Sequence, residues 1–376
     1  MKYHFIAFTV AILSLLSFNL SLLNKDFRFN KDKKFRIVQF TDLHYGEPSK
    51  DIYTTEIAER LLNYTKPDLV AITGDSISGN LWDGTSKNFY QNIWTKFTAP
   101  FQTCQIPYAY TTGNHDTDAD KGIEEIMALD ITHPFSAKRE YNKPVSNTEL
   151  SFLAMQKLSG TGVSSSNYFI KIYSHDNEAK DSKVVAIVWF FDSGSMGCED
   201  MKESWGCISS AQIQWYEHSS LLIVKELGYM PDGFAFFHIP LPEMRIAYNT
   251  QESYGGLRRQ LLHCPNKQTH FFDSVKKMGN MKAMFCGHDH NNDFCVNHEG
   301  VELCYGRKTG YGSDGPTGFQ RGARVIDLEE KTDDKGKVYF TYSQFTIQED
   351  FSIQTQDYQR GFHGHTDTIK ECVFLK

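Results

Sequence analysis

The sequence predicts a single layered α/β domain, and three observations support this fold class. Short apolar runs of strand length alternate with segments of helical periodicity. Each apolar run ends in a polar or glycine-containing turn. The chain of 376 residues, 40% of them hydrophobic, is long enough for one large core and contains neither repeats nor a low-complexity linker. We therefore expect one domain of the α/β (α+β layered) class over residues 33–349, followed by a polar tail at 350–376.

The order of elements begins with a β-α-β unit. The runs FRIVQFTD at 35–42 and DLVAITGD at 68–75 have the length of strands, and apolar side chains recur at helical spacing around 57–62 between them. Residues 317–347 predict two or three antiparallel strands around the turn DDKG. Four further runs have strand length and end in such turns: IPYAYTTG, KVVAIVWFFD, GFAFFHIP and MKAMFCG. Loops at the carboxyl ends of strands in α/β sheets carry functional sites, so these strand ends are the places to search.

The charge distribution excludes a nucleic-acid partner. The formal net charge is −7, and no block of Lys or Arg occurs. Neutralising a phosphate backbone requires clustered positive charge. We expect no nucleic-acid surface.

The N-terminal residues 1–24 resemble a secretory address. Lys2 precedes an uncharged apolar stretch at residues 5–23. This length lies between a long signal peptide and a signal-anchor helix, which needs about 20 residues. The pattern favours a cleaved signal and leaves an anchor open. A secreted or lumenal protein is expected, with membrane attachment only if this segment is uncleaved.

The cysteines favour disulfides, because the secretory lumen is oxidising. The chain contains eight cysteines. Two local pairs can be proposed, Cys198 with Cys207 and Cys295 with Cys304 across a predicted hairpin, and the other connectivities stay open. Buried free thiols are the alternative. The sequence Asn63-Tyr64-Thr65 is a glycosylation acceptor if it faces solvent, which would make the protein a glycoprotein.

Side chains of the types that can bind metal follow five of the apolar runs. They are Asp42 and His44 in FTDLH, Asp75 in ITGDS, Asn114, His115 and Asp116 in TTGNHD, His238 in FFHIP, and His288 and His290 in CGHDH. Each motif alone is commonest as a turn or a solvated surface group. Together, carboxylate, imidazole and amide oxygen suit Zn, Mn or Fe, and the missing thiolate argues against a softer metal. Five such motifs at strand ends predict a metal site for hydrolytic chemistry.

The ordered set D-x-H, GD, GNHD, H and GHxH resembles the calcineurin-like metallophosphoesterase superfamily. That resemblance implies a β-sandwich of mixed sheets flanked by helices, and it covers residues 35 to about 330. The stretches FFHIPLPE, WFFDSG with SSAQIQWYE, and GFQRGARVI are similar to the short, purple-acid-phosphatase-like branch of the superfamily.

The resemblance also implies a role for each motif residue. The first of two metal ions would be bound by Asp42, His44 and His290, and the second by Asn114, His238 and His288. Asp75 would bridge the two ions. Residues two apart in an extended segment share a face, which allows His288 and His290 to reach adjacent ions. His115 would face the leaving oxygen of the substrate and donate to it, and Asp116 would orient the His115 imidazole.

One position departs from the purple acid phosphatases. Those enzymes have a tyrosine three residues after the bridging aspartate, and its charge transfer to iron gives the purple colour. The present chain has Ser78 there. The branch that lacks the tyrosine iron ligand is therefore the better match, and Fe, Mn and Zn all stay open as cofactors.

The expected function is metal-dependent hydrolysis of phosphate monoesters by a metal-activated hydroxide at the dinuclear site. Substrates would be small phosphates or phosphoproteins. The alternatives are a phosphodiesterase with the same two metals and a catalytically silent metal-binding protein. Other histidines, His263 among them, are expected to be surface or core groups. His363-Gly364-His365 repeats the spacing of the metal motif but follows no apolar strand, so we expect no metal there.

Overall fold

Two large mixed sheets form the centre of the molecule. The computed structural model describes residues 26–137, 166–176, 183–256, 258–315, 318–354 and 369–374. The first sheet has six strands in the order β15 (Ile353–Gln354), β14 (Val338–Gln348), β13 (Gly322–Thr332), β1 (Lys34–Phe40), β2 (Leu69–Thr73) and β3 (Tyr108–Thr111). The second has seven, in the order β4 (Tyr168–Tyr173), β5 (Val184–Phe190), β8 (Asp232–Phe236), β10 (Met281–Cys286), β12 (Val301–Tyr305), β11 (Cys295–His298) and β9 (Ser253–Tyr254).

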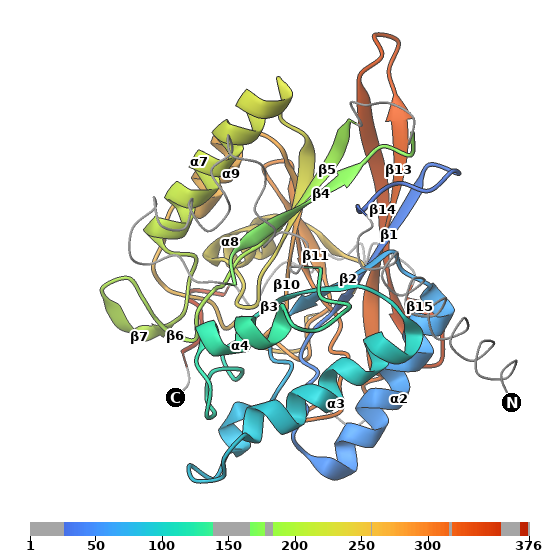
Figure 1. Ribbon diagram of the computed structural model, residues 1–376. Helices are drawn as coiled ribbons and strands as arrows, with labels where there is room; N and C mark the ends of the chain where they lie inside the picture. Colours follow the sequence, from blue (N-terminus) through green and yellow to red (C-terminus); the bar gives the residue numbers. More distant parts are fainter. Residues whose placement is uncertain are drawn as a thin grey trace, which may run out of the picture.

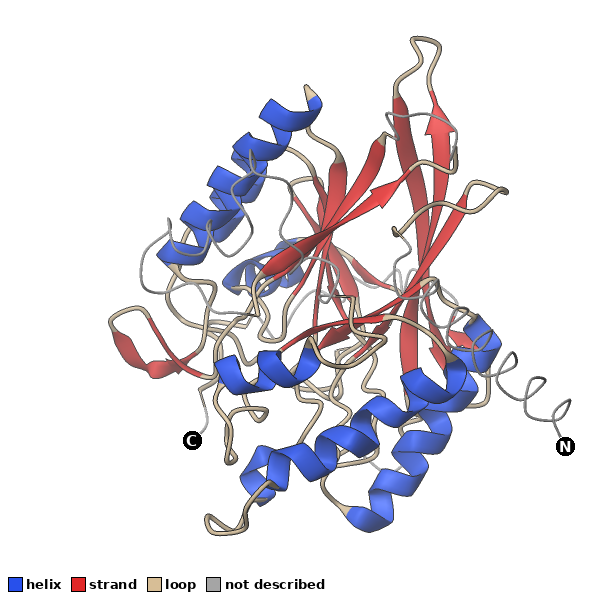
Figure 2. Cartoon of the chain, in the orientation of Figure 1, coloured by secondary structure: helices blue, strands red, loops and turns tan. Residues whose placement is uncertain are grey.

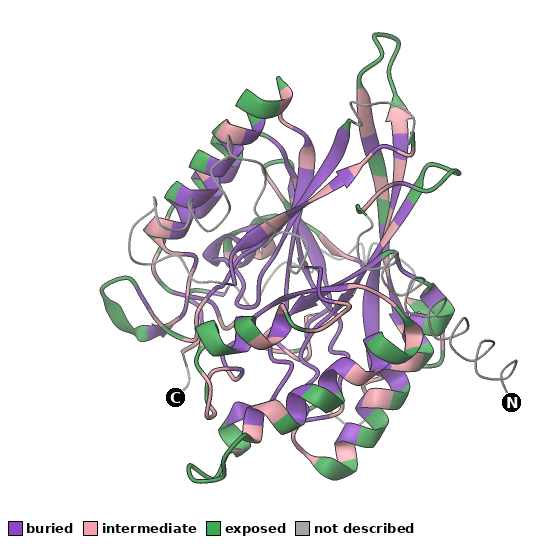
Figure 3. Cartoon of the chain, viewed as in Figure 1, coloured by how far each residue is buried: buried purple, intermediate pink, exposed green. Residues whose placement is uncertain are grey.

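Helices cover the outer faces of this pair of sheets (Figures 1 and 2). Hydrophobic side chains of α2 (Pro48–Thr65), α3 (Phe89–Cys104) and α4 (Ile123–Asp130) pack on the first sheet. Those of α7 (Ser210–Leu227), α8 (Pro242–Thr250) and α9 (Phe271–Met278) pack on the second. Figure 3 shows buried residues along the central strands and on one side of the helices. The result is the predicted β-sandwich of mixed sheets flanked by helices.

The core lies in three layers, one between the sheets and one under each set of helices. Ile37 of β1 and Leu69 of β2 face Val188 of β5 and Phe234 of β8 in the central layer. A strand covered on both faces reads as a continuous apolar run, not as an alternating one. This explains why the β2 sequence LVAIT and the β5 sequence VVAIVWF are buried at every position.

The first sheet is parallel from β1 to its β3 edge and antiparallel from β1 to β15, whereas the second sheet is parallel in its middle and antiparallel at both edges. β1, β2 and β3 are parallel neighbours, as are β5, β8, β10 and β12. Parallel neighbours direct their carboxyl ends to the same edge of a sheet. β13 and β14 form the expected long antiparallel hairpin, with Thr332 paired to Val338 across the turn. The predicted site motifs all follow strands of the parallel parts.

Several elements were not expected from the sequence. β4 pairs with the edge of the second sheet, and β6 (Met196–Cys198) with β7 (Met201–Trp205) forms a separate hairpin that projects from the body (Figure 1). β15 and residues 369–374 lie beyond residue 349 and contact the domain, since β15 pairs with β14 and Cys372 bonds to Cys264. The predicted leader 1–24 and the His363-Gly364-His365 motif lie outside the described residues. The helices that are described include none with the length and apolar character of a membrane span.

The structure contains three disulfides. Both predicted pairs are present, Cys198–Cys207 and Cys295–Cys304, and the second joins directly opposed residues of β11 and β12. The third, Cys264–Cys372, joins residues 108 apart in the sequence and was not predicted. Cys104 and Cys286 are free thiols. A long-range pair of this kind has no local signal, because it depends on where the tail packs.

We predict that the long-range disulfide contributes more stability than a local one. In the chain-entropy description, a closed loop restricts the unfolded state more as it lengthens. Replacing Cys264 and Cys372 together by Ser should lower the free energy of unfolding by about 2–5 kcal/mol, and the Cys198 and Cys207 double replacement by less. Denaturant unfolding of both double variants measures this difference. An equal or smaller loss for the Cys264 and Cys372 pair would contradict the prediction.

Candidate metal centre

The polar motifs follow neighbouring parallel strands of the two sheets. Asp42 and His44 come after β1, Asp75 after β2 and Asn114 after β3 in the first sheet. His238 follows β8, and His288 and His290 follow β10, in the second sheet. The carboxyl ends of both parallel regions meet at one edge of the sandwich. All seven side chains predicted to bind metal are brought together there.

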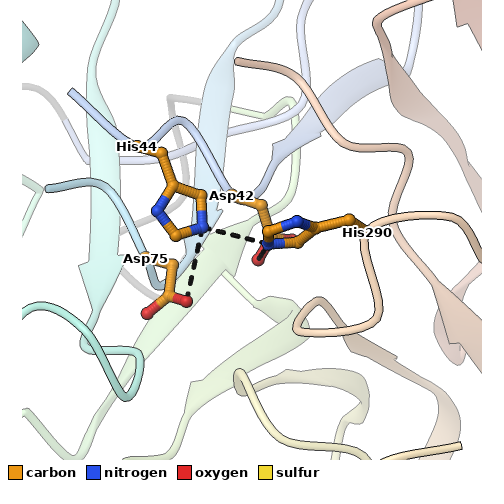
Figure 4. Close-up of side chains that lie close together, drawn as sticks. All are labelled: Asp42, His44, Asp75 and His290. Atoms are coloured by element: carbon orange, nitrogen blue, oxygen red, sulfur yellow. Dashed lines mark hydrogen bonds and ion pairs between the residues drawn. The ribbon is translucent and has the colours of Figure 1, made fainter. Parts of the chain in front are cut away.

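Four of these side chains form a compact cluster, shown in Figure 4. Asp42, His44, Asp75 and His290 each contribute one potential ligand atom, and the four atoms lie within 4.8 Å of one another. The Nε2 atoms of His44 and His290 are 3.0 Å apart. His44 Nε2 lies 3.5 Å from Asp75 Oδ2, and His290 Nε2 lies 3.5 Å from Asp42 Oδ1. Two imidazole nitrogens facing each other between two carboxylates suit a bound cation.

A second group adjoins the first through Asp75. His238 Nε2 lies 3.2 Å from the same Asp75 Oδ2 and 2.9 Å from the amide oxygen of Asn114. The His288 ring lies 5.1 Å from the His238 ring, centroid to centroid. His288 Nε2 is buried and has no hydrogen-bond partner among the described residues. A buried polar atom without a partner is costly, so this nitrogen is suited to a metal ion.

Three of the imidazoles are held by their other ring nitrogen. His44 Nδ1 lies 3.0 Å from Ser78 Oγ, His238 Nδ1 lies 2.8 Å from the carbonyl oxygen of Thr73, and His290 Nδ1 lies 2.5 Å from Asp314 Oδ1. In every case Nε2 is the atom that faces the cluster. Holding Nδ1 fixes the ring orientation and leaves the Nε2 lone pair for a metal.

The backbone at the centre adopts unusual conformations. Asp42, His44, Asp75 and His288 have positive φ values of 52°, 51°, 48° and 74°. Such conformations cost free energy in residues with a side chain, and they cluster at functional sites. The loops also approach each other closely, since a Cβ on Gly113 would lie 2.3 Å from the Asp75 backbone nitrogen. Because Gly113 has no side chain, the loop after β3 can pack directly against the backbone of Asp75.

Three of the four shifted groups have protonation states that suit metal ligands, and His238 would have to lose a proton to bind an ion. Burial lowers the pKa of His44 and of His288 well below the ordinary value for histidine, so both imidazoles are neutral. Burial also opposes the charges on His238 and Asp75, but their attraction outweighs it. The attraction between the two groups raises the pKa of His238 to about 9 and lowers the pKa of Asp75 well below its usual range. The Asp75 carboxylate is thus charged, which suits an interaction with a cation.

The expected pairing of His115 with Asp116 is wrong. Asp116 is fully buried, and its two carboxylate oxygens accept hydrogen bonds from the backbone nitrogens of Gly113, Ser76 and Ile77. His115 Nδ1 instead lies 2.8 Å from Asp118 Oδ2. Asp116 stabilises the loops after β2 and β3, because a carboxylate can accept several backbone donors at once.

His115 lies next to the cluster of four side chains but is not one of them. Its side chain is 33% exposed, and its ring centroid lies 5.6 Å from that of His44. Its backbone N–H donates to Asp75 Oδ1 over 2.8 Å. The imidazole thus lies at the surface of the site, where a substrate group can reach it.

Three residues that hold the site were missed from the sequence: Ser78, Asp118 and Asp314. Asp118 could have been found, because it lies three residues after His115 in the same turn. Asp314 carries no local signal, since it follows His290 by 24 residues. His263, expected to be an ordinary surface or core group, pairs with the central aspartate of GHDH, its Nδ1 lying 2.6 Å from Asp289 Oδ1.

Comparison with known proteins decides the family. The sequence profile of the calcineurin-like phosphoesterases matches residues 35–292. The chain belongs to the calcineurin-like phosphoesterase family. This family is classed among the hydrolases, and the expected resemblance and fold are confirmed.

Its relatives include plant and yeast proteins. The protein named probable inactive purple acid phosphatase 28 of Arabidopsis thaliana is 30% identical over 322 residues, which are 81% of this chain and 78% of that one. Probable inactive purple acid phosphatase 29 of the same plant is 29% identical, over 82% of this chain and 80% of that one. Phosphatase DCR2 of Saccharomyces cerevisiae is 28% identical over 73% of this chain and 47% of its own length.

A solved structure shares the fold of this phosphoesterase. A dimetal phosphatase from Danio rerio aligns with a TM-score of 0.51 at 10% identity, covering 85% of this chain and 99% of that one. At this identity the likeness concerns the fold alone. Family and side-chain cluster together indicate a site for metal ions.

Proposed function

We propose that this phosphoesterase hydrolyses phosphate monoesters with two metal ions at the carboxyl edge of its sheets. The first ion would be bound by Asp42, His44 and His290, the second by Asn114, His238 and His288, with Asp75 shared. The observation that carries the proposal is Asp75 Oδ2, which lies 3.5 Å from His44 Nε2 and 3.2 Å from His238 Nε2. One carboxylate oxygen between two nitrogen-rich groups suits a bridging ligand.

The donor set fits divalent Fe, Mn or Zn. It consists of imidazoles, carboxylates and one amide oxygen, without a thiolate. The buried Nε2 of His288, which lacks a partner among the described residues, is the atom that an ion would satisfy. When bound, two such ions supply Lewis-acid activation of water and neutralise the charge that develops on the phosphoryl group.

The other groups of the site have two roles: some orient the metal-binding imidazoles, and His115 interacts with the substrate. Ser78 and the Thr73 carbonyl hold His44 and His238 with Nε2 toward the centre. His115, held at Nδ1 by Asp118, presents Nε2 to the leaving oxygen of the ester and donates a proton or a hydrogen bond to it. Asp118 takes the orienting role that the sequence suggested for Asp116.

The names of the plant relatives favour a second candidate function. They are called probable inactive, which suits a metal-binding protein without turnover. Against this candidate stand the complete set of seven potential ligands and the position of His115 beside them. A phosphodiesterase that uses the same ions is a variant of the first proposal, because the difference depends on loops around the site.

The test compares p-nitrophenyl phosphate with bis(p-nitrophenyl) phosphate, with metal analysis of the same sample. Faster turnover of the monoester with two bound ions supports the proposal. Faster turnover of the diester assigns a phosphodiesterase. Two bound ions without turnover of either ester identify a silent metal-binding protein.

We predict that the iron-loaded protein lacks the visible tyrosinate-to-iron charge-transfer band. Ser78 occupies the position of the tyrosine ligand, and its hydroxyl is 3.0 Å from His44 Nδ1. Tyr305, the last residue of β12, donates its hydroxyl to Asp289 Oδ2 over 2.5 Å and so is engaged elsewhere. Absorption spectroscopy of protein loaded with Fe(III) checks this. A purple sample whose colour disappears on mutation of a tyrosine would contradict it.

We propose that the protein acts in the secretory pathway, on small phosphates or phosphoproteins there. The three disulfides support an oxidising compartment. The acceptor Asn63 lies exposed on α2, where its side-chain nitrogen donates to the carbonyl oxygen of Glu59. A shift in mobility after glycosidase treatment, lost in Asn63→Gln, tests this location.

A further inference from the structure

Asp314 contacts His290 of the candidate metal site from a part of the chain beyond the family match, which ends at residue 292. Its Oδ1 lies 2.5 Å from His290 Nδ1. The opposite nitrogen, His290 Nε2, lies 3.0 Å from His44 Nε2 and 3.5 Å from Asp42 Oδ1. Asp314, His290 and the cluster therefore form one line of contacts.

The partner of His290 differs in charge from the other imidazole partners. His44 is held by a hydroxyl and His238 by a backbone carbonyl, both neutral groups. Asp314 is a carboxylate. A carboxylate behind a ligating histidine fixes the ring and increases its basicity, which strengthens the bond to a metal.

The segment that carries Asp314 is itself firmly attached to the loop of Asp42 and His44. Thr309 N donates to the Thr41 carbonyl oxygen over 2.9 Å, and Lys308 Nζ donates to the Asp42 carbonyl oxygen over 3.1 Å. The two backbones come so close that a Cβ on Gly310 would lie 1.9 Å from the Leu43 carbonyl oxygen. Movement of this segment would therefore displace the loop that bears two of the ligands.

The residue before Asp314 is anchored at the start of α2. Ser313 N donates to Glu47 Oε1 over 2.7 Å, and Lys50 Nζ donates to the Ser313 carbonyl oxygen over 3.1 Å. Glu47 and Lys50 also form an ion pair of 2.8 Å. The side chain of Asp314 is 77% exposed, but the backbone of the preceding residue is held at both its N–H and its carbonyl group. Its position against His290 thus follows from the attachment of the segment.

We propose that Asp314 is a positioning residue of the first metal ion, holding His290 with Nε2 toward Asp42 and His44. This inference rests on the two-metal site proposed above. Asp314 does not touch the ion and acts only through the imidazole. Its loss should weaken one of the two ions and leave the other, bound by Asn114, His238 and His288, unchanged.

The test measures Zn²⁺ binding to the metal-free protein by calorimetry, with Asp314→Ala and Asp314→Asn. We expect the Kd of one ion to rise about 10–100-fold in the alanine variant, as for other groups that support a ligand, and less in the asparagine variant. Asp314→Glu should restore part of the affinity. The melting temperature of the metal-free protein should not change, because the side chain is mostly exposed.

Asp273→Asn is the matched control. Asp273 and His270 form an equivalent pair, with Oδ2 and Nδ1 2.8 Å apart, and both side chains are exposed, at 73% and 75%. The control should bind both ions as the unmodified protein does. Kd values for Asp314→Ala within about threefold of the unmodified protein would overturn the positioning role alone. An unmodified protein that binds no Zn²⁺ at this site would overturn the two-metal proposal as well.

Discussion

Replacing Asp75 by Asn is expected to remove both metal ions and all turnover. Its Oδ2 lies between His44 and His238, one from each half of the site, and its other oxygen accepts the His115 N–H over 2.8 Å. An amide offers one neutral oxygen in place of a charged pair, so two cations would be left repelling each other. The loss of metal affinity should be greater than the usual loss of about 10–100-fold that follows removal of a group that only supports a ligand.

Metal analysis and turnover of the same Asp75→Asn sample measure this effect. Asp327→Asn serves as the control, because Asp327 forms a bidentate pair with Arg36 between β13 and β1 and does not contact the cluster. The control should retain both ions. A variant at Asp75 that keeps two ions and normal turnover would sink the bridging assignment.

Replacing His115 by Ala should lower turnover by about 10²–10⁴ and leave both ions bound. The imidazole lies beside the cluster, with its ring 5.6 Å from the His44 ring, and its Nδ1 is engaged by Asp118. A group in this position can donate to a leaving oxygen without binding metal. The loss should be greater for alkyl phosphates, whose alkoxides need a proton, than for nitrophenyl phosphate.

Two aspartate variants separate catalysis from loop structure in this region. Asp118→Asn should reduce turnover of alkyl phosphates while both ions stay bound, because the group that orients His115 is weakened. Asp116→Ala should instead lower the melting temperature, since three backbone N–H groups lose their acceptor. Loss of metal in His115→Ala, or equal slowing of both ester types, would make His115 a ligand or a binding residue.

The candidate ligands could be found from the sequence because each follows a strand at a local signal. Asp42 and His44 follow FRIVQF, and Asp75 follows LVAIT, and the apolar composition of both runs indicates their burial. A strand end has a fixed place in a parallel sheet, so a polar residue there has a predictable position. Both local disulfides could be predicted from the sequence as well, because the two cysteines of each pair are only nine residues apart and a short loop or hairpin brings them together.

Other contacts could not be predicted from the sequence, because no periodic pattern indicates the direction of a side chain in a loop. Asp116 was expected to orient His115, but the tight turn after β3 directs it to the backbone of Ser76 and Ile77. The Cys264–Cys372 bond depends on the packing of a tail whose sequence is polar. The contact of His263 with Asp289 also depends on the fold, because 26 residues separate the two.

The sequence by itself determined that the segments before the candidate ligands become strands and which chemical groups follow them, because periodicity, glycines and apolar runs act within a few residues. Only the tertiary structure decided how those ends meet. His44 and His290 are 246 residues apart, on loops of different sheets, and their nitrogens come within 3.0 Å because the central core holds the two sheets face to face. The contact of Asp314 with His290 has the same origin, since it depends on the attachment of residues 308–313 to the first ligand loop and to α2.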